Sequence, residues 1–114
     1  MYRIISGKWK AKRISAPKNF DVRPTTDFAK EALFSILANR YDVEFCSVLD
    51  LFAGIGSITL ELASRDCQDI TAVEMNPKHA AFINSTASEL EMALQINVQR
   101  GDVFEWLKKN RTKK

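Results

Sequence analysis

The feature that most constrains the fold of this chain is a regular alternation of strand-like and helix-like segments after Cys46. The apolar runs with strand composition are 47–51, 69–73 and 95–99, and the helical segments that follow them are 57–65, 76–92 and 103–109. Ser57 is predicted to cap the first of these helices, and Asn76 the second, with Pro77 as its first helical residue. Consecutive parallel strands need a crossover connection, which is usually a helix. The sequence therefore predicts an α/β fold built on parallel strands.

A different pattern precedes Cys46. Apolar residues flank the turn pair Ser6-Gly7, from Tyr2 to Ile5 and from Trp9 to Ile14, which predicts a short β-hairpin. Pro17 and Pro24 then resist helix formation. The chain between them is therefore expected to be an irregular connector.

A helix is predicted to begin at Thr25 to Asp27 and to end near Asn39 to Tyr41. Its apolar residues recur at helical spacing and predict one buried face. They are Phe28, Ala29, Ala32, Leu33, Ile36 and Leu37. We accordingly divide the chain into a basic hairpin and connector, residues 1–24, and an α/β domain, residues 25–114.

Charge is unevenly distributed along the chain, although the net charge is only +3. Residues 1–23 carry seven Lys and Arg side chains against one acid, Asp21. A basic segment of this kind suits a polyanion such as RNA, although a solvated charged surface would look the same. The residues predicted to contact RNA are Lys8, Trp9, Lys10, Lys12 and Arg13. For Trp9 two interpretations stay open: the indole stacks on a base, or it packs on the domain.

Composition disfavours several kinds of protein and site. No apolar run approaches the roughly 20 residues that span a bilayer, and the N-terminus lacks the apolar stretch of a signal peptide, so we expect a cytoplasmic protein without membrane contact. Cys46 and Cys67 lie outside any paired ligand spacing, which favours reduced thiols over a metal site or a disulfide. His79 is expected on a helix surface without a catalytic role.

The loop that follows the first strand of the predicted sheet resembles a nucleoside-binding turn. It runs from Asp50 to Ser57, and Gly54 and Gly56 let the backbone approach a ligand closely. A dinucleotide would place its pyrophosphate here, where the Asp50 carboxylate repels it. S-adenosylmethionine has no phosphate and carries a cationic amino group and a sulfonium, which a carboxylate attracts. Because Thr59 also replaces the third glycine of a dinucleotide fingerprint, the sequence favours S-adenosylmethionine.

Two further acids follow the next two strands. Glu74 comes about 20 positions after the glycine-containing turn, where a carboxylate can accept hydrogen bonds from both ribose hydroxyls. Asp102 ends the third strand and is expected to accept from the adenine amino group, with Val103 or Phe104 against the ring. Each acid alone would also fit a helix cap. Three acids at successive strand ends favour a cofactor site.

Four segments of the chain together resemble the RsmD family, bacterial methyltransferases that modify guanine N2 in 16S ribosomal RNA. They are Arg3-Ile-Ile-Ser-Gly7, Arg23-Pro-Thr-Thr-Asp27, Glu31-Ala-Leu-Phe34 and Val48-Leu-Asp-Leu-Phe-Ala-Gly54. The resemblance implies a Rossmann-like class I S-adenosylmethionine-dependent methyltransferase fold and a substrate in the RNA of the small ribosomal subunit. It further implies that residues 23–26 close over the methionine end of the cofactor, with Glu31 and Phe34 on the helix behind them.

The charge argument and the resemblance together predict one set of cofactor-binding residues. They are Arg23, Thr25, Thr26, Asp50, Phe52, Ala53, Gly54, Gly56, Glu74, Met75, Asp102 and Val103. The family's catalytic motif, Asp-Pro-Pro-Tyr after a fourth strand, does not occur in the sequence. We therefore expect a fragment with the first three parallel strands, which binds the cofactor but contains no catalytic residue and does not methylate.

The same expectation has a structural consequence. Residues 48–51 would form an apolar sheet edge without a neighbour, and such an edge invites pairing with a second copy as a dimer. Two other functions stay open. A non-catalytic RNA-binding module would explain the basic segment, whereas a dinucleotide-binding oxidoreductase domain is disfavoured by Asp50 and Thr59.

Overall fold

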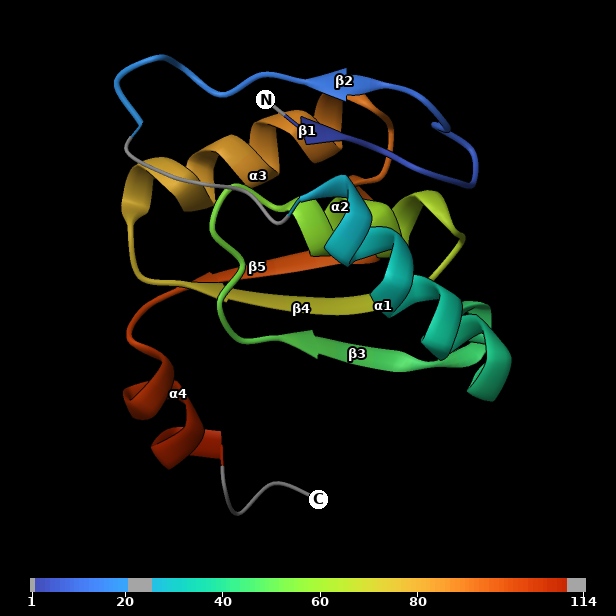
Figure 1. The fold of residues 1–114 in the computed structure, drawn as a ribbon. Coiled ribbons are helices and arrows are strands. Elements are labelled where there is room, and N and C mark those ends of the chain that lie inside the picture. The colour runs from blue at the N-terminus through green and yellow to red at the C-terminus, as the bar shows by residue number, and fades with distance from the viewer. Residues whose placement is uncertain (1, 21–25, 111–114) are drawn as a thin grey trace.

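The computed structural model describes residues 2–20 and 26–110. The strands are β1 (Tyr2–Arg3), β2 (Arg13–Ile14), β3 (Ser47–Asp50), β4 (Asp69–Glu74) and β5 (Ile96–Arg100). The α-helices are α1 (Asp27–Arg40), α2 (Ser57–Ser64), α3 (Pro77–Glu89) and α4 (Val103–Asn110), and short 3-10 helices occur at Val43–Phe45 and Ala93–Gln95. Strands β3, β4 and β5 form a parallel sheet in that order, while β1 and β2 form a separate antiparallel pair (Figure 1). The predicted α/β class is confirmed.

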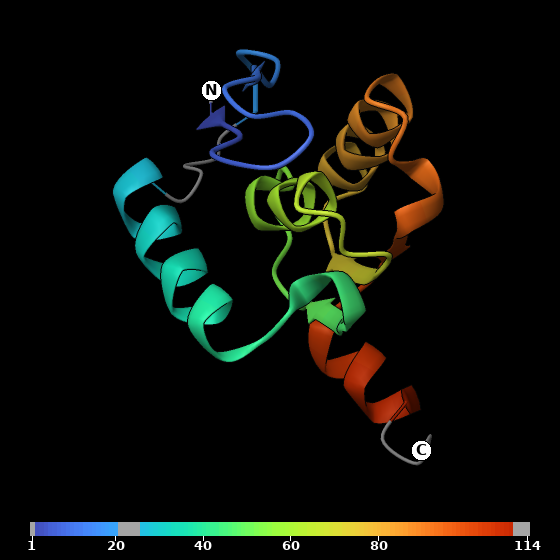
Figure 2. The ribbon, with the colours of Figure 1, turned by 90° about the vertical axis from the view of Figure 1, so that its right-hand side faces the viewer.

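Helices α2 and α3 cover one face of the parallel sheet, and α4 lies toward the other (Figures 1 and 2). Helix α2 connects β3 to β4 and α3 connects β4 to β5, as crossover connections must in a parallel sheet. Ile70 and Ala72 on β4 share one buried cluster with Leu60 of α2 and Ile83 of α3. The hydrophobic core therefore lies between the sheet and these two helices.

Two helix starts follow the predicted caps, and one does not. Thr26 accepts a hydrogen bond from the Ala29 amide at 3.2 Å, and Asn76 caps α3 with Pro77 as its first residue. The expectation that Ser57 caps α2 is wrong, because Gly56 is the cap at φ 88° and Ser57 is already helical. A Cβ at Gly56 would lie 3.0 Å from Cγ1 of Ile83, a tight contact that adds to the preference of the left-handed φ for glycine.

The hairpin is present, but its strands are only two residues long because the chain between them turns toward α2. The Lys8 amide donates to the carbonyl of Ser64 at 2.7 Å, and the Trp9 amide donates to the Ser64 hydroxyl at 2.9 Å. Gly7, at φ +89°, permits this approach, since a Cβ there would lie 1.9 Å from the Ser64 carbonyl oxygen. The hairpin is thus docked on α2 through its backbone.

A buried ion pair, absent from the sequence-based expectations, joins α1, α2 and the hairpin. The side chains of Lys30 and Glu61 are both 0% exposed, and Nζ of Lys30 lies 3.5 Å from Oε1 of Glu61. Lys30 also donates to the carbonyl of Arg3 at 2.7 Å. The Glu61 carboxylate accepts from the amides of Ile5 and Ser6, at 2.8 and 3.0 Å, and from Nε of Arg65 at 2.8 Å. Every charge is thus hydrogen-bonded, as buried charges must be.

The buried face predicted for α1 is wrong. Phe28, Leu33 and Ile36 are 85%, 41% and 56% exposed, whereas Lys30 and Phe34 are the buried residues of this helix. The Lys30–Glu61 pair and the Phe34 ring, which lies 4.5 Å beneath the Arg65 guanidinium, turn the helix to this orientation. Helix periodicity gave no sign that a lysine would be the buried residue.

Strand β3 lies at an edge of the sheet and pairs with β4 alone among the described residues. Leu49 in this strand is 43% exposed, so the predicted apolar edge is confirmed. In the described ranges no helix is long and apolar enough to cross a membrane. Cys67 is buried, Cys46 is half-buried, and both are free thiols.

Candidate cofactor site

The carboxyl ends of β3, β4 and β5 meet at one edge of the sheet, where the chain forms a pocket of about 150 Å³. The pocket is lined by Leu51, Phe52, Val73, Glu74, Met75, Asp102, Val103 and Phe104. Phe52, Met75 and Phe104 are 74%, 65% and 74% exposed. Large exposed apolar side chains grouped beside carboxylates are typical of a ligand site. The predicted residues from three strand ends are therefore brought together here.

Glu74, the last residue of β4, is held in one orientation. Its Oε1 accepts from the Gly54 amide at 2.8 Å, and its Oε2 accepts from the Asn76 amide at 2.9 Å. Nδ1 of His79 lies 3.7 Å from the same Oε2. A carboxylate has about four lone-pair positions, so two acceptor positions remain after these two hydrogen bonds. Two acceptors on one carboxylate are what the paired hydroxyls of a ribose require.

Asp50 ends β3, and its carboxylate is oriented by a residue of α2. The hydroxyl of Thr59, which is fully buried, donates to Oδ2 of Asp50 at 2.7 Å. Burial raises the pKa of Asp50, against the opposing effect of hydrogen bonds from Thr59 and the Phe52 backbone. An organic cation beside this carboxylate would favour its charged form. Thr59 therefore has a positioning role that the sequence argument, which used it only against a dinucleotide, did not assign.

Asp102 both caps a helix and lines the pocket, which are the two roles that the sequence allowed for it. Its Oδ1 accepts from the amides of Phe104 and Glu105, at 2.9 and 3.1 Å, and so caps α4. It also lines the pocket together with Val103, which is buried, and Phe104, which is exposed. The helix cap fixes the acid at the rim beside these apolar side chains.

Four other predicted cofactor residues that the structure describes, Thr26, Ala53, Gly54 and Gly56, do not line the pocket. Gly54 and Gly56 adopt φ 56° and 88°, and Ala53 donates to the Val73 carbonyl at 3.3 Å, so the turn is fixed against the end of β4. Thr26 caps α1. Arg23 and Thr25 lie outside the described residues. Phe104, expected with Val103 as a candidate for the adenine ring, also lines the pocket, whereas Leu51 and Val73 are pocket residues that the sequence did not predict, although their places beside Asp50 and Glu74 would have indicated them.

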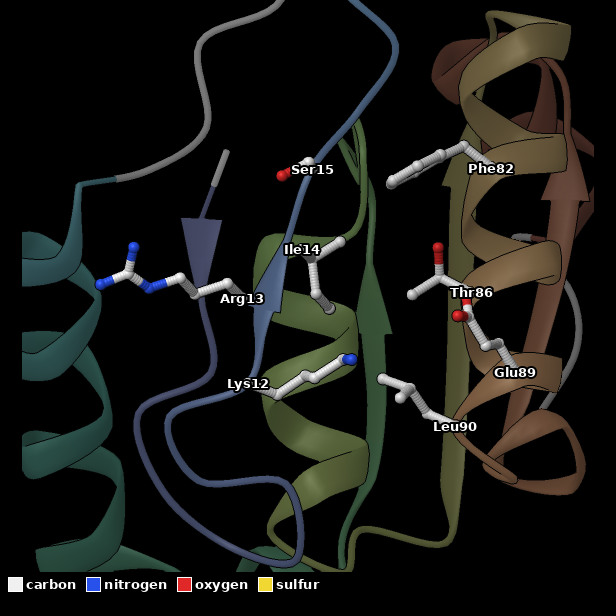
Figure 3. A pocket seen from close by; sticks show the side chains of 8 residues that line it. All are labelled: Lys12, Arg13, Ile14, Ser15, Phe82, Thr86, Glu89 and Leu90. Carbon is white, nitrogen blue, oxygen red and sulfur yellow. The ribbon is translucent and has the colours of Figure 1, made fainter.

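The residues predicted to contact RNA lie on the hairpin. A second pocket, of about 220 Å³, lies between the chain around β2 and helix α3, and Lys12 and Arg13 line it (Figure 3). Figure 3 shows the Lys12 side chain reaching toward α3 and the Arg13 side chain pointing away from it. Trp9 donates its indole N–H to the Leu90 carbonyl at 2.9 Å. Of the two interpretations of Trp9, the structure therefore shows the one in which the indole packs on the domain.

The fold is similar to several solved structures. The yhhF protein of Escherichia coli superposes with a TM-score of 0.80 at 32% identity, covering 93% of this chain and 56% of that one. A hypothetical protein of Thermus thermophilus gives a TM-score of 0.82 at 27% identity, covering 97% and 61%. An RNA methyltransferase from Salinibacter ruber in complex with S-adenosyl-L-homocysteine gives 0.63 at 20% identity, covering 73% and 52%, which shows a shared fold. The Rossmann-like methyltransferase fold is thus confirmed.

Curated relatives bear names that agree with this fold. A ribosomal RNA small subunit methyltransferase D from Buchnera aphidicola is 33% identical over 107 residues, which is 94% of this chain and 54% of that protein. The protein of the same name from Escherichia coli is 40% identical over 74 residues, 65% of this chain and 36% of that protein. The chain spans about half the length of the first relatives it matches. A family model described as conserved hypothetical protein 95 matches residues 2–114. The chain therefore belongs to this family, the RsmD family of ribosomal RNA methyltransferases.

Proposed function

We propose that this chain forms the S-adenosylmethionine-binding half of a methyltransferase that acts on guanine N2 of small-subunit ribosomal RNA. The observation that carries the proposal is the orientation of Glu74, whose two backbone hydrogen bonds leave acceptor positions at a pocket with exposed apolar walls. The names of the relatives support the RNA substrate. The S-adenosyl-L-homocysteine complex of the Salinibacter ruber protein supports the cofactor.

Each part of the pocket has a role in this proposal. Glu74 accepts from the ribose hydroxyls, and Asp102 accepts from the adenine amino group while Phe52, Met75 and Val103 pack on the ring. Asp50 attracts the cationic amino group, and the turn of Ala53, Gly54 and Gly56 lets the backbone approach the ligand. Arg23, Thr25 and Thr26 cover its methionine end. When bound, S-adenosylmethionine supplies a methyl group on a sulfonium.

The alternative of a dinucleotide-binding oxidoreductase is disfavoured by the geometry of Asp50. Its carboxylate is fixed by Thr59 at the start of the glycine-containing turn, where it would repel a pyrophosphate. A non-catalytic RNA-binding module would also use the hairpin to bind RNA, but it would leave the acids of the pocket without a role. This alternative predicts that the chain does not bind the cofactor and that its RNA affinity is unchanged when the acids of the pocket are replaced.

The RNA substrate is proposed to contact the basic residues of the hairpin. Lys8, Lys10, Lys12 and Arg13 are all exposed there. Exposed Lys and Arg side chains bind the phosphate backbone and make the affinity depend on salt. Trp9, which packs against the end of α3, contributes by fixing the hairpin that carries these charges.

The Asp-Pro-Pro-Tyr motif is not among the 114 residues, so this chain by itself is proposed to bind the cofactor without transferring the methyl group. The protein acts in the cytoplasm, on RNA of the small ribosomal subunit. The exposed β3 edge pairs with a second copy of the chain, and a molar mass independent of concentration in light scattering would exclude that pairing.

Calorimetric titration with S-adenosylmethionine, S-adenosylhomocysteine and NAD tests the cofactor site. Glu74→Ala removes two charge-assisted hydrogen bonds to the ribose, each of about 1.5–3 kcal/mol, so the affinity for the first two ligands should fall by at least roughly tenfold. Glu89→Ala is the matched control, because this acid lies on α3 outside the cofactor pocket. Tighter binding of NAD, or unchanged affinity in Glu74→Ala, would overturn the proposal.

A further inference from the structure

We infer that His79 is a positioning residue that holds Glu74 for the ribose of the cofactor and links it to the segment of residues 15–20. The inference deepens the proposed function and rests on Glu74 being the ribose acceptor. Among the described residues, the basic side chain that contacts this carboxylate is His79. Nothing in the family motifs quoted above includes it.

The position of His79 is set by the first turn of α3. Asn76 caps the helix and accepts from the His79 amide at 3.4 Å, which places the imidazole above the end of β4. The side chains of His79 and Glu74 are only 13% and 14% exposed. The sequence predicted His79 on a helix surface, and the structure shows that neighbouring residues cover most of its side chain.

The distance between the two groups explains how His79 can restrain the Glu74 carboxylate without occupying the positions that would accept from the ribose. Nδ1 lies 3.7 Å from Oε2 of Glu74, which is a close contact but longer than a hydrogen bond. The imidazole thus confines the carboxylate on one side without using its lone pairs, which stay available to hydroxyl groups. The Asn76 amide, at 2.9 Å from the same oxygen, fixes the other side.

An aromatic contact connects His79 to the N-terminal part of the chain. The Phe20 ring lies 5.0 Å from the imidazole, between ring centroids, and 6.0 Å from the Phe82 ring in an edge-on arrangement. The imidazole is thus held between the Phe20 ring and the Glu74 carboxylate, in one cluster, Phe20–His79–Glu74.

Ribose-dependent binding tests this inference. The chain is titrated with S-adenosylhomocysteine and with its 2′-deoxy analogue, which lacks one hydroxyl for Glu74. In His79→Ala the affinity for S-adenosylhomocysteine should fall roughly three- to tenfold, as expected when one of two contacting side chains is removed, while that for the analogue changes less. The ratio of the affinity for S-adenosylhomocysteine to that for the analogue should also fall in Phe20→Ala, but by less. This substitution keeps the imidazole and removes only its contact with the Phe20 ring. Lys78→Ala, an exposed neighbour on α3, is the control and should leave the ratio unchanged.

The outcomes separate the inference from the proposed function. If the unaltered chain binds no S-adenosylhomocysteine, the cofactor site is wrong and the role of His79 falls with it. If the unaltered chain binds and His79→Ala weakens both ligands equally, or neither, the cofactor site stands and the positioning role is wrong. Should His79→Ala not fold, His79→Gln gives the same comparison with the imidazole replaced by a side chain of similar length.

Discussion

Docking of the hairpin on α2 makes glycine necessary at position 7, and Gly7→Ala measures how much stability that contact contributes. A Cβ there would lie 1.9 Å from the Ser64 carbonyl oxygen and 2.3 Å from the Ser64 carbonyl carbon. Both are backbone atoms of a helix, so the hairpin has to move rather than the obstacle. The movement breaks the hydrogen bonds of Lys8 and Trp9 to Ser64, each about 1 kcal/mol, and the left-handed φ costs alanine a further 1–2 kcal/mol or so.

The expected loss of unfolding free energy in Gly7→Ala is therefore about 3–4 kcal/mol, measured by urea denaturation at constant m-value. Gly54→Ala is the matched control, because Gly54 also has a positive φ, 56°, but a Cβ there meets nothing within 4 Å. This control should lose only the cost of the backbone conformation, about 1–2 kcal/mol. Equal losses in the two variants would refute the reasoning, since the hairpin would then not press on α2.

Three further changes test other parts of the structure. Glu61→Ala leaves the Lys30 ammonium buried without its partner and should cost about 3–5 kcal/mol in urea denaturation; a loss below 1 kcal/mol or so would mean that Lys30 reaches solvent. Because burial raises the pKa of Asp50 above its unfolded value, the stability of the chain relative to Asp50→Asn should be greatest below the unfolded pKa and should fall as the pH rises through the folded pKa; a pH-independent difference would contradict this. Trp9→Phe removes the hydrogen bond to Leu90 and should cost about 1 kcal/mol without weakening RNA binding in a filter assay, whereas a large loss of RNA affinity would favour base stacking.

Much of the architecture could be predicted because local chemistry and the global fold agree. The strands at 69–74 and 96–100 lie within one residue of their expected bounds, and Asn76-Pro77 begins α3 as its cap chemistry requires. That Glu74 and Asp102 would meet could be predicted for the same reason, since parallel strands bring their carboxyl ends to one edge. Local signals thus brought residues of the candidate site together, although they did not give the full lining of its pocket.

The errors come from contacts between residues far apart in the sequence. The face that α1 buries is decided by Lys30, whose partner Glu61 is on another helix, and a hydropathy pattern treats both as surface residues. The role of Thr59 depends likewise on Asp50, and that of His79 on Glu74 and Phe20. Polar contacts of this kind leave no periodic trace, so they have to be seen in three dimensions.

The docking of the hairpin also constrains the order in which the chain can fold. The amides of Ile5 and Ser6 bind a carboxylate on Glu61, and the Tyr2 hydroxyl donates to the Ile55 carbonyl at 2.9 Å, so the partners are separated by 53 to 56 positions. Contacts with such separation form late, because a long loop has to close before they stabilise anything. During synthesis, residues 2–6 leave the ribosome before α2 and must therefore wait for that helix before they can take their native positions. A fusion partner placed before Met1 would be tethered to a segment that folds only then.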